Sequence, residues 1–218
     1  MNVMAIGAHP DDIEFGCSGT LMRHIHANDH VVYVCMTNTE SKSGTTGVVL
    51  RTSDELFDEV KCATEEMGIE TLEFLDFKDL HVPFSFKSVS TLDKLIQKHK
   101  IDTIYTHWAG DSNQDHISTY KSTMAAARYV RNVYCYEQIP IPRLTENEMT
   151  VNYYVDISDY MKDKIRVAKC HKSQIKKYKQ VGFDVPNRLR VLAEFRGIQA
   201  NCKYAEGFHI IKKVENGC

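Results

Sequence analysis

Long hydrophobic runs, internal repeats and low-complexity segments are all missing from this sequence of 218 residues. No apolar stretch approaches the ~20 residues that a membrane-spanning helix needs, so we expect no integral membrane segment. An excess of one charge is missing too, because 27 Lys and Arg nearly balance 29 Asp and Glu. The net charge of −2 argues against a general nucleic-acid or anionic-membrane binder. The N-terminal residues show neither a basic region nor a cleavage site, so we expect no signal peptide.

Paired cysteines are also missing. The seven cysteines are odd in number and scattered, and none forms a C-x-x-C pair. This usage is typical of reduced thiols in a cytoplasmic protein rather than of a disulfide framework. We therefore expect a cytoplasmic location and no disulfide bonds. The cysteines are Cys17, Cys35, Cys62, Cys135, Cys170, Cys202 and Cys218.

Short apolar, β-branched runs alternate with helical patterns through residues 3–136. This alternation predicts βαβ units in a Rossmann-like three-layer α/β/α fold with a mostly parallel central sheet. The less regular last third is assigned to the same domain, so residues 1–218 are expected to form one domain. Predicted strands are 3–6, 30–37, 71–75, 101–106, 132–136, 151–155 and 208–213. Predicted helices are 18–28, 51–67, 89–98, 117–130, 158–178 and 187–200, with loops at 39–47 and 76–87.

Metal-binding side chains follow two of these strands. His9-x-Asp11-Asp12 comes after strand 3–6, and Asn113-x-Asp115-His116 comes after strand 101–106. Ligands of open α/β sheets bind beyond the carboxyl ends of the strands, so both clusters are expected at one rim. His9, Asp12 and His116 can supply a His and carboxylate set for zinc, iron or manganese.

The carboxylates beside this set have two interpretations. Asp11 is placed to act as a general base beside a metal-bound water, and Asp115 to hold an imidazole from behind. The alternative is that Asp11 and Asp12 only cap the following helix, because Asp is a favoured N-cap residue. Spacing alone does not decide between them.

A resemblance to a known family adds to these observations. The stretch from Ala8 to Leu21 closely resembles the start of the LmbE-like, or PIG-L, deacetylases, and the stretch from Asp111 to His116 resembles their second motif. Weaker similarities occur at residues 51, 59–68, 171–174 and 204–208. The resemblance implies zinc-dependent removal of N-acetyl groups from N-acetylglucosaminyl substrates. It also implies that His9, Asp12 and His116 bind Zn²⁺ and that Asp11 is the catalytic base; the same ligand set suits Fe²⁺.

One position departs from the family pattern. Many members have a histidine that assists the transition state where this sequence has Asn113. We expect Asn113 to orient the substrate or its oxyanion, and Asp11 to serve as both base and acid. His107 and His171 are alternative acids and candidate substrate contacts. Arg51 suits a phosphate or carboxylate on a sugar, although a surface arginine is an equally good interpretation.

The leading hypothesis is therefore a metal-dependent N-deacetylase of an amino sugar or its conjugate, with an N-acetylated small molecule as its partner. Hydrolysis of another small N-acyl amide and a catalytically impaired sugar-binding protein stay open. A homo-oligomer is also left open, because family members often assemble. A nucleotide-binding protein is disfavoured, since the turn from Gly7 to Pro10 lacks the G-x-G-x-x-G pattern.

Overall fold

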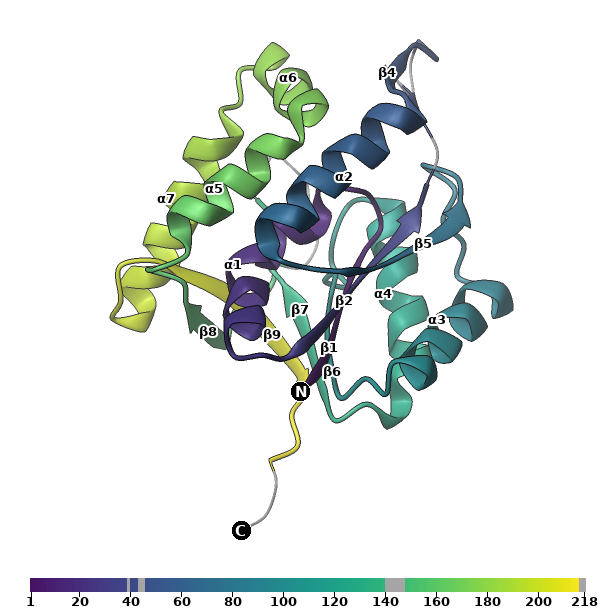
Figure 1. The fold of residues 1–218 in the computed structure, drawn as a ribbon, viewed down its shortest axis with the longest axis vertical. Coiled ribbons are helices and arrows are strands. Elements are labelled where there is room, and N and C mark those ends of the chain that lie inside the picture. Colours follow the sequence, from purple (N-terminus) through teal and green to yellow (C-terminus); the bar gives the residue numbers. More distant parts are fainter. Residues whose placement is uncertain (39, 43–45, 140–147, 216–218) are drawn as a thin grey trace.

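A seven-stranded sheet forms the centre of the computed structural model, which describes residues 1–38, 40–42, 46–139 and 148–215 (Figure 1). The strand order is β5-β2-β1-β6-β7-β9-β8. Strands β5 to β7 in this order pair in parallel, whereas β9 pairs antiparallel with both β7 and β8. The prediction of a mostly parallel sheet is confirmed. The strands are β1 (Asn2–Gly7), β2 (His30–Thr37), β5 (Thr71–Phe77), β6 (Thr103–Thr106), β7 (Asn132–Tyr136), β8 (Tyr153–Asp156) and β9 (Ala205–Lys212).

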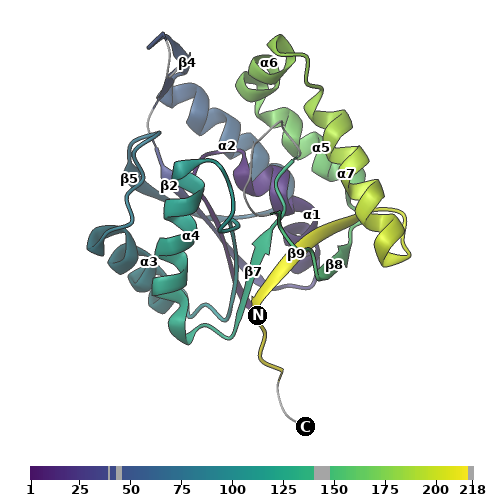
Figure 2. The ribbon, with the colours of Figure 1, turned by 180° about the vertical axis from the view of Figure 1, so that it is seen from behind.

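Helices cover both faces of the sheet, which gives the three layers (Figures 1 and 2). Strand β1 is apolar from Val3 to Ile6 because both of its faces are buried: Val3 and Ala5 join one buried cluster, while Met4 and Ile6 join the other. One face carries α1 (Asp12–His26), α2 (Ser53–Met67), α5 (Met161–Cys170) and α7 (Val185–Ala200). The other carries α3 (Phe86–Lys98), α4 (Gln114–Ala126) and the 3₁₀ turn Ala127–Tyr129. Helix α6 (Lys172–Gln180) lies at one end of the molecule, as does β4 (Val49–Arg51).

Several element boundaries differ from the predicted ones for local reasons. Arg51 does not begin a helix; it ends β4, and α2 starts later because Thr52 and Glu55 form a capping box. Part of the predicted loop 39–47 is β3 (Ser41–Lys42), which pairs antiparallel with β4, while residues 39 and 43–45 lie outside the described part. The predicted helix 158–178 is two helices, α5 and α6, separated at His171.

One cysteine prediction is wrong. Cys62 of α2 and Cys170 of α5 form a disulfide across a separation of 108 residues. The two helices pack side by side on the sheet, a contact that cysteine spacing does not reveal. Cys218 lies outside the described residues, and the remaining cysteines carry free thiols: Cys17, Cys35, Cys135 and Cys202.

The helices of the described residues include none with both the length and the apolar character needed to span a membrane.

Candidate metal centre and active site

Two neighbouring strands bring the predicted metal ligands together. Because β1 pairs with β6, the turn after β1 lies beside the start of α4, which follows β6. Donor atoms of His9, Asp12 and His116 all lie within 4.8 Å of one another. His116 Nε2 is 3.2 Å from Asp12 Oδ1, and His9 Nδ1 is 3.4 Å from Asp12 Oδ2. The strand-end clusters therefore form one site.

Each imidazole of this set is held from behind by a carboxylate. His116 Nδ1 lies 2.8 Å from Asp111 Oδ2. His9 Nε2 lies 3.1 Å from Asp115 Oδ2 and 3.3 Å from Asp79 Oδ1. Carboxylates in this position fix ring orientation and increase the basicity of a metal-binding imidazole. Asp115 does hold an imidazole, that of His9, and its other oxygen accepts the Val82 N–H at 3.1 Å.

The donor set fits a divalent transition metal. Two imidazoles and a carboxylate suit zinc, ferrous iron or manganese. Although burial opposes a charged imidazole, Asp115, Asp12 and Asp79 raise the pKa of His9 well above its ordinary value. Burial likewise opposes charge on His116, yet Asp12 and Asp111 raise its pKa. The surrounding carboxylates thus favour positive charge at this place.

Asp11 lies next to the ligand set without belonging to it. Its backbone has φ of 126°, an uncommon and strained conformation for a residue with a side chain. Asp11 occupies the N-cap position of α1, but its side chain makes no capping hydrogen bond. Burial raises the pKa of Asp11 to about 6, and Asp12 adds to the shift while Arg51 opposes it. Helix capping does not account for this side chain.

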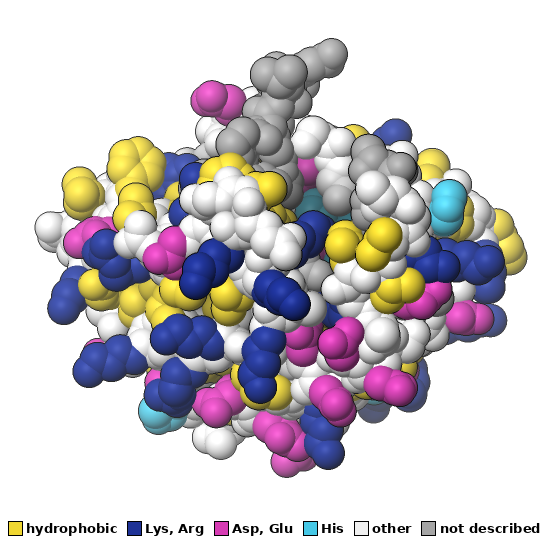
Figure 3. Space-filling model, turned by 90° about the horizontal axis from the view of Figure 1, so that it is seen from above, with side chains coloured by type: hydrophobic (Ala, Val, Ile, Leu, Met, Phe, Trp, Pro, Cys, Tyr) yellow, Lys and Arg dark blue, Asp and Glu magenta, His cyan; other side chains and the backbone are white. Residues whose placement is uncertain are grey.

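The ligand set and Asp11 open into a cavity of about 380 Å³. Figure 3 views the corresponding face, where Lys and Arg side chains lie around a hollow. The cavity is bounded on one side by the strand-end residues and on the other by β3, β4 and α6. Its lining residues are His9, Asp11, Asp12, Phe15, Ser41, Lys42, Leu50, Arg51, Asp79, Leu80, Asn113, His116, Gln138, Ile139, Gln174, Lys177 and Tyr178.

Two predicted substrate contacts do line this cavity. Asn113 Oδ1 accepts the Asp115 N–H at 2.8 Å as the cap of α4, so the NH₂ group is the part that can meet a substrate. Arg51 is only 3% exposed; it donates to Pro10 O at 3.0 Å and lies 3.6 Å from Glu59. The interpretation of Arg51 as a surface residue is therefore wrong.

His107 and His171 do not fit their predicted roles. Both are fully buried and lie outside the cavity lining, so neither is placed to contact substrate or protonate a leaving group. His107 Nε2 accepts the Ala8 N–H at 3.0 Å and lies 3.2 Å from Asp12 Oδ2. Burial lowers the pKa of His107 to about 4, with His116 adding to the shift, so it is neutral at pH 7. His171 instead pairs with the buried Glu14, Nε2 to Oε1, at 3.0 Å.

Tyr136 packs behind His107, with its ring against the backbone of α1. Tyr136 donates its O–H to Ile6 O at 2.9 Å and lies 3.1 Å from His107 Nε2. Its ring lies against Gly16 of α1, where any Cβ atom would clash with the ring. Gly16 is therefore needed for this packing behind the site.

Sequence reasoning missed several residues of the site. Asp111 could have been predicted, because it lies inside the second motif, five residues before His116. Asp79 lies in a segment without a periodic pattern, and Gln138 follows β7; nothing local marks either one. Gln138 donates to Asp12 O at 3.1 Å. The residues of β3 and α6 reach the cavity only through tertiary packing.

The sequence is similar to a family of known deacetylases. A sequence model described as PIG-L, GlcNAc-PI de-N-acetylase, matches residues 4–127. The uncharacterized deacetylase YaiS of Escherichia coli K12 is 31% identical over 141 residues, covering 62% of this chain and 72% of YaiS. The diacetylchitobiose deacetylase of Thermococcus kodakarensis is 26% identical over 228 residues, covering 97% and 84%.

The fold itself is shared more widely. GalB, the 4-carboxy-2-hydroxymuconate hydratase of Pseudomonas putida KT2440, superposes with a TM-score of 0.80 at 19% identity, covering all of both chains. A protein with this architecture can thus catalyse another reaction, and the fold does not assign the activity. The family, in contrast, is established by a sequence match that includes both strand-end motifs: this chain belongs to the PIG-L (LmbE-like) deacetylase family.

Proposed function

We propose that the protein is a metal-dependent hydrolase that removes the N-acetyl group from an amino sugar or an amino-sugar conjugate. The observation that carries the proposal is the position of Asp11. This carboxylate lines the cavity beside the donor set of His9, Asp12 and His116, yet it neither belongs to that set nor caps α1. A carboxylate beside a metal site that neither belongs to the donor set nor caps a helix is suited to proton transfer.

In the proposed reaction, water adds to the acetyl carbon, the C–N bond breaks, and acetate and a free amine leave. A divalent ion such as Zn²⁺ or Fe²⁺, when bound, supplies a Lewis acid and acidifies a water molecule. Asp11 accepts a proton from the attacking water and returns it to the departing nitrogen. Asn113 donates an N–H to the acetyl oxygen, where negative charge develops. Asp111 and Asp115 keep the two imidazoles in position.

Asp11 is given both proton transfers because of which side chains line the cavity. Asn113 is an amide and cannot act as an acid at neutral pH. His107 and His171 are buried behind the wall. Among the residues predicted from the sequence for proton transfer, Asp11 is the one that lines the cavity.

The cavity also supports an anionic sugar conjugate as substrate. Arg51, Lys42 and Lys177 all contribute to its lining. The guanidinium of Arg51 is buried near Asp11, and its Nε has no hydrogen-bond partner among the described residues. We propose Arg51 and Asn113 as substrate-binding residues. A single domain, a cytoplasmic location and a homo-oligomer remain predictions.

The test measures acetate release from N-acetylhexosamines, nucleotide sugars and glycoconjugates, using protein of known metal content. We expect release that stops on chelation and returns with metal. Asp11→Asn should lower kcat by roughly 10²–10⁴, the usual contribution of general acid–base catalysis, with metal content unchanged. Asp159→Asn, at an exposed carboxylate remote from the cavity lining, is the matched control.

Two results would contradict the proposal in different ways. Full activity of Asp11→Asn would remove the carboxylate from the mechanism. No acetate from any substrate with metal-loaded protein would leave the alternatives, a different N-acyl amide as substrate or an impaired sugar-binding protein. N-formyl and other N-acyl amines in the same panel distinguish these two.

A further inference from the structure

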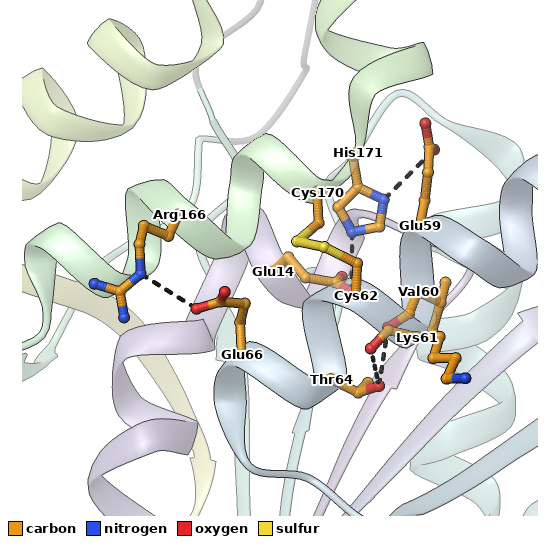
Figure 4. Close-up of a disulfide and its surroundings, with 10 residues drawn as sticks. All are labelled: Glu14, Glu59, Val60, Lys61, Cys62, Thr64, Glu66, Arg166, Cys170 and His171. Carbon is orange, nitrogen blue, oxygen red and sulfur yellow. Dashed lines mark hydrogen bonds and ion pairs between the residues drawn. A yellow bond between two sulfur atoms is a disulfide. The ribbon is translucent and has the colours of Figure 1, made fainter.

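The disulfide between Cys62 and Cys170 lies at the surface, close to the active-site cavity wall. Cys62 is exposed on α2, and Cys170 is the last residue of α5 (Figure 4). Both line a second cavity of about 340 Å³, which also contains residues of α6. A small thiol can therefore reach the sulfur of Cys62 without unfolding of the core. Accessible disulfides of this kind undergo thiol exchange more readily than buried ones.

The disulfide also fixes the junction between α5 and α6. His171, next to Cys170, is both the C-cap of α5 and the N-cap of α6. Glu59 lies one turn before Cys62 on α2 and accepts two hydrogen bonds from Ser173 of α6, one from N–H at 2.6 Å and one from the hydroxyl at 2.8 Å. The pairs Glu59–Ser173 and Cys62–Cys170 thus tie the same face of α2 to the start of α6.

Helix α6 depends on this junction because it is weakly packed. Gln174 is its one buried residue, and Ile175 and Tyr178 are half-buried against the core. Its four lysines and Gln180 are exposed. Yet α6 contributes Gln174, Lys177 and Tyr178 to the lining of the active-site cavity. The position of a helix that buries few side chains is set mainly by the contacts that hold its two ends. The order of this cavity wall therefore depends on the link to α2.

We propose that Cys62–Cys170 is a reversible thiol–disulfide site through which a dithiol reductant loosens the α6 wall of the cavity. A thiolate of the reductant attacks Cys62 Sγ, the Sγ–Sγ bond breaks, and Cys170 leaves as a thiolate that takes up a proton. The second thiol of the reductant then attacks the mixed disulfide and releases Cys62. Two electrons and two protons pass to the protein, and the reductant ends as its own disulfide. An effect on substrate binding rests on the proposed function; the change in α6 does not.

The test treats the folded protein with dithiothreitol and follows two quantities without using activity. Reactive thiols should rise by two, mapped by alkylation to Cys62 and Cys170. Amide hydrogen exchange of residues 172–180 should become roughly tenfold faster or more, while β1 stays protected. Cys62→Ser should exchange like the reduced wild type. Cys202→Ser, which removes a half-buried thiol outside the disulfide, should respond to dithiothreitol as the wild type does.

Either of two results would overturn the proposal. Release of the thiols only after denaturation would show that the disulfide is not accessible in the folded state. Release of two thiols with unchanged amide hydrogen exchange at 172–180 would show that reduction of the disulfide does not loosen α6. If acetate release is found, reduction should raise KM with kcat held within about twofold, since the donor set lies on the opposite wall. If no acetate release is found, the hydrogen-exchange result still tests the disulfide proposal. Failure of the proposed function and failure of this proposal are therefore distinguishable.

Discussion

The two walls of the active-site cavity differ in how they are built. The strand-end wall carries His9 in the turn after β1, and Asp12 and His116 in the first turns of α1 and α4, the helices that follow β1 and β6. Its imidazoles are backed by Asp111, Asp115 and Asp79, and both Asp12 and His116 are buried. The opposite wall consists of the two-stranded hairpin β3–β4 and the weakly packed α6.

Under the proposed function, this difference places the reacting groups on one wall and substrate recognition on the other. Reacting groups must be held to within a fraction of an ångström, which buried side chains with carboxylate partners achieve. The hairpin and α6 instead present Lys42, Leu50, Lys177 and Tyr178, partly or largely exposed side chains on small elements. Substitutions in the strand-end wall should therefore affect metal and kcat, and substitutions in the second wall should affect KM.

The largest effect is expected from His116→Ala. Removal of this donor should abolish stoichiometric metal binding and lower kcat by roughly 10³-fold or more, since electrostatic stabilisation of the developing charge alone contributes about 10²–10³. Metal analysis and acetate release measure the two losses. His26→Ala removes an exposed imidazole of α1 and should change neither. One metal ion per chain in a fully active His116→Ala protein would show that the donor set is misassigned.

A smaller effect is expected from the carboxylates behind the imidazoles. Asp111→Asn and Asp115→Asn should each weaken metal affinity by about 10–100-fold, because an amide holds and polarises an imidazole less well than a carboxylate does. Competition with a chromophoric chelator measures the dissociation constants. If both variants bind metal as tightly as the wild type, the backing carboxylates do not tune the affinity of the imidazoles for metal.

The smallest effect is expected from Lys177→Ala. For an anionic sugar conjugate, KM should rise by roughly twofold to fivefold with kcat unchanged, because an exposed charge contributes little in water. Lys179→Ala is the matched control, as Lys179 lies on α6, is also exposed and does not line the cavity. A change in kcat for Lys177→Ala alone would mean that the second wall takes part in the chemical step.

Much of the strand-end wall could be predicted. The run from Val3 to Ile6 is apolar because β1 is buried on both faces, and this continuity makes the strand visible in the sequence. Polar residues directly after such a strand then stand out. The strand Asn132–Tyr136 has the predicted bounds for the same reason.

The second wall could be predicted only in part. β3 has two residues and β4 has three, too few for an alternating pattern. Most of α6 falls within the predicted helix 158–178, but its separation from α5 at His171 was not predicted. The direction in which a side chain points is also hard to predict from sequence, as His107 and His171 show. Both sit near motif residues in the sequence, but packing turns them away from the cavity and into the interior.

The sequence is enough to predict the alternation of strands and helices, the mostly parallel sheet and the positions of the two strand-end clusters. These follow from local patterns, since burial on both faces of a strand and the turn after it are encoded by consecutive residues. Three features could be seen only in the folded protein: Asp115 backs His9, Asp79 and α6 reach the cavity, and Cys62 meets Cys170. Those contacts join residues far apart in the chain, and their geometry depends on how whole helices pack against the sheet.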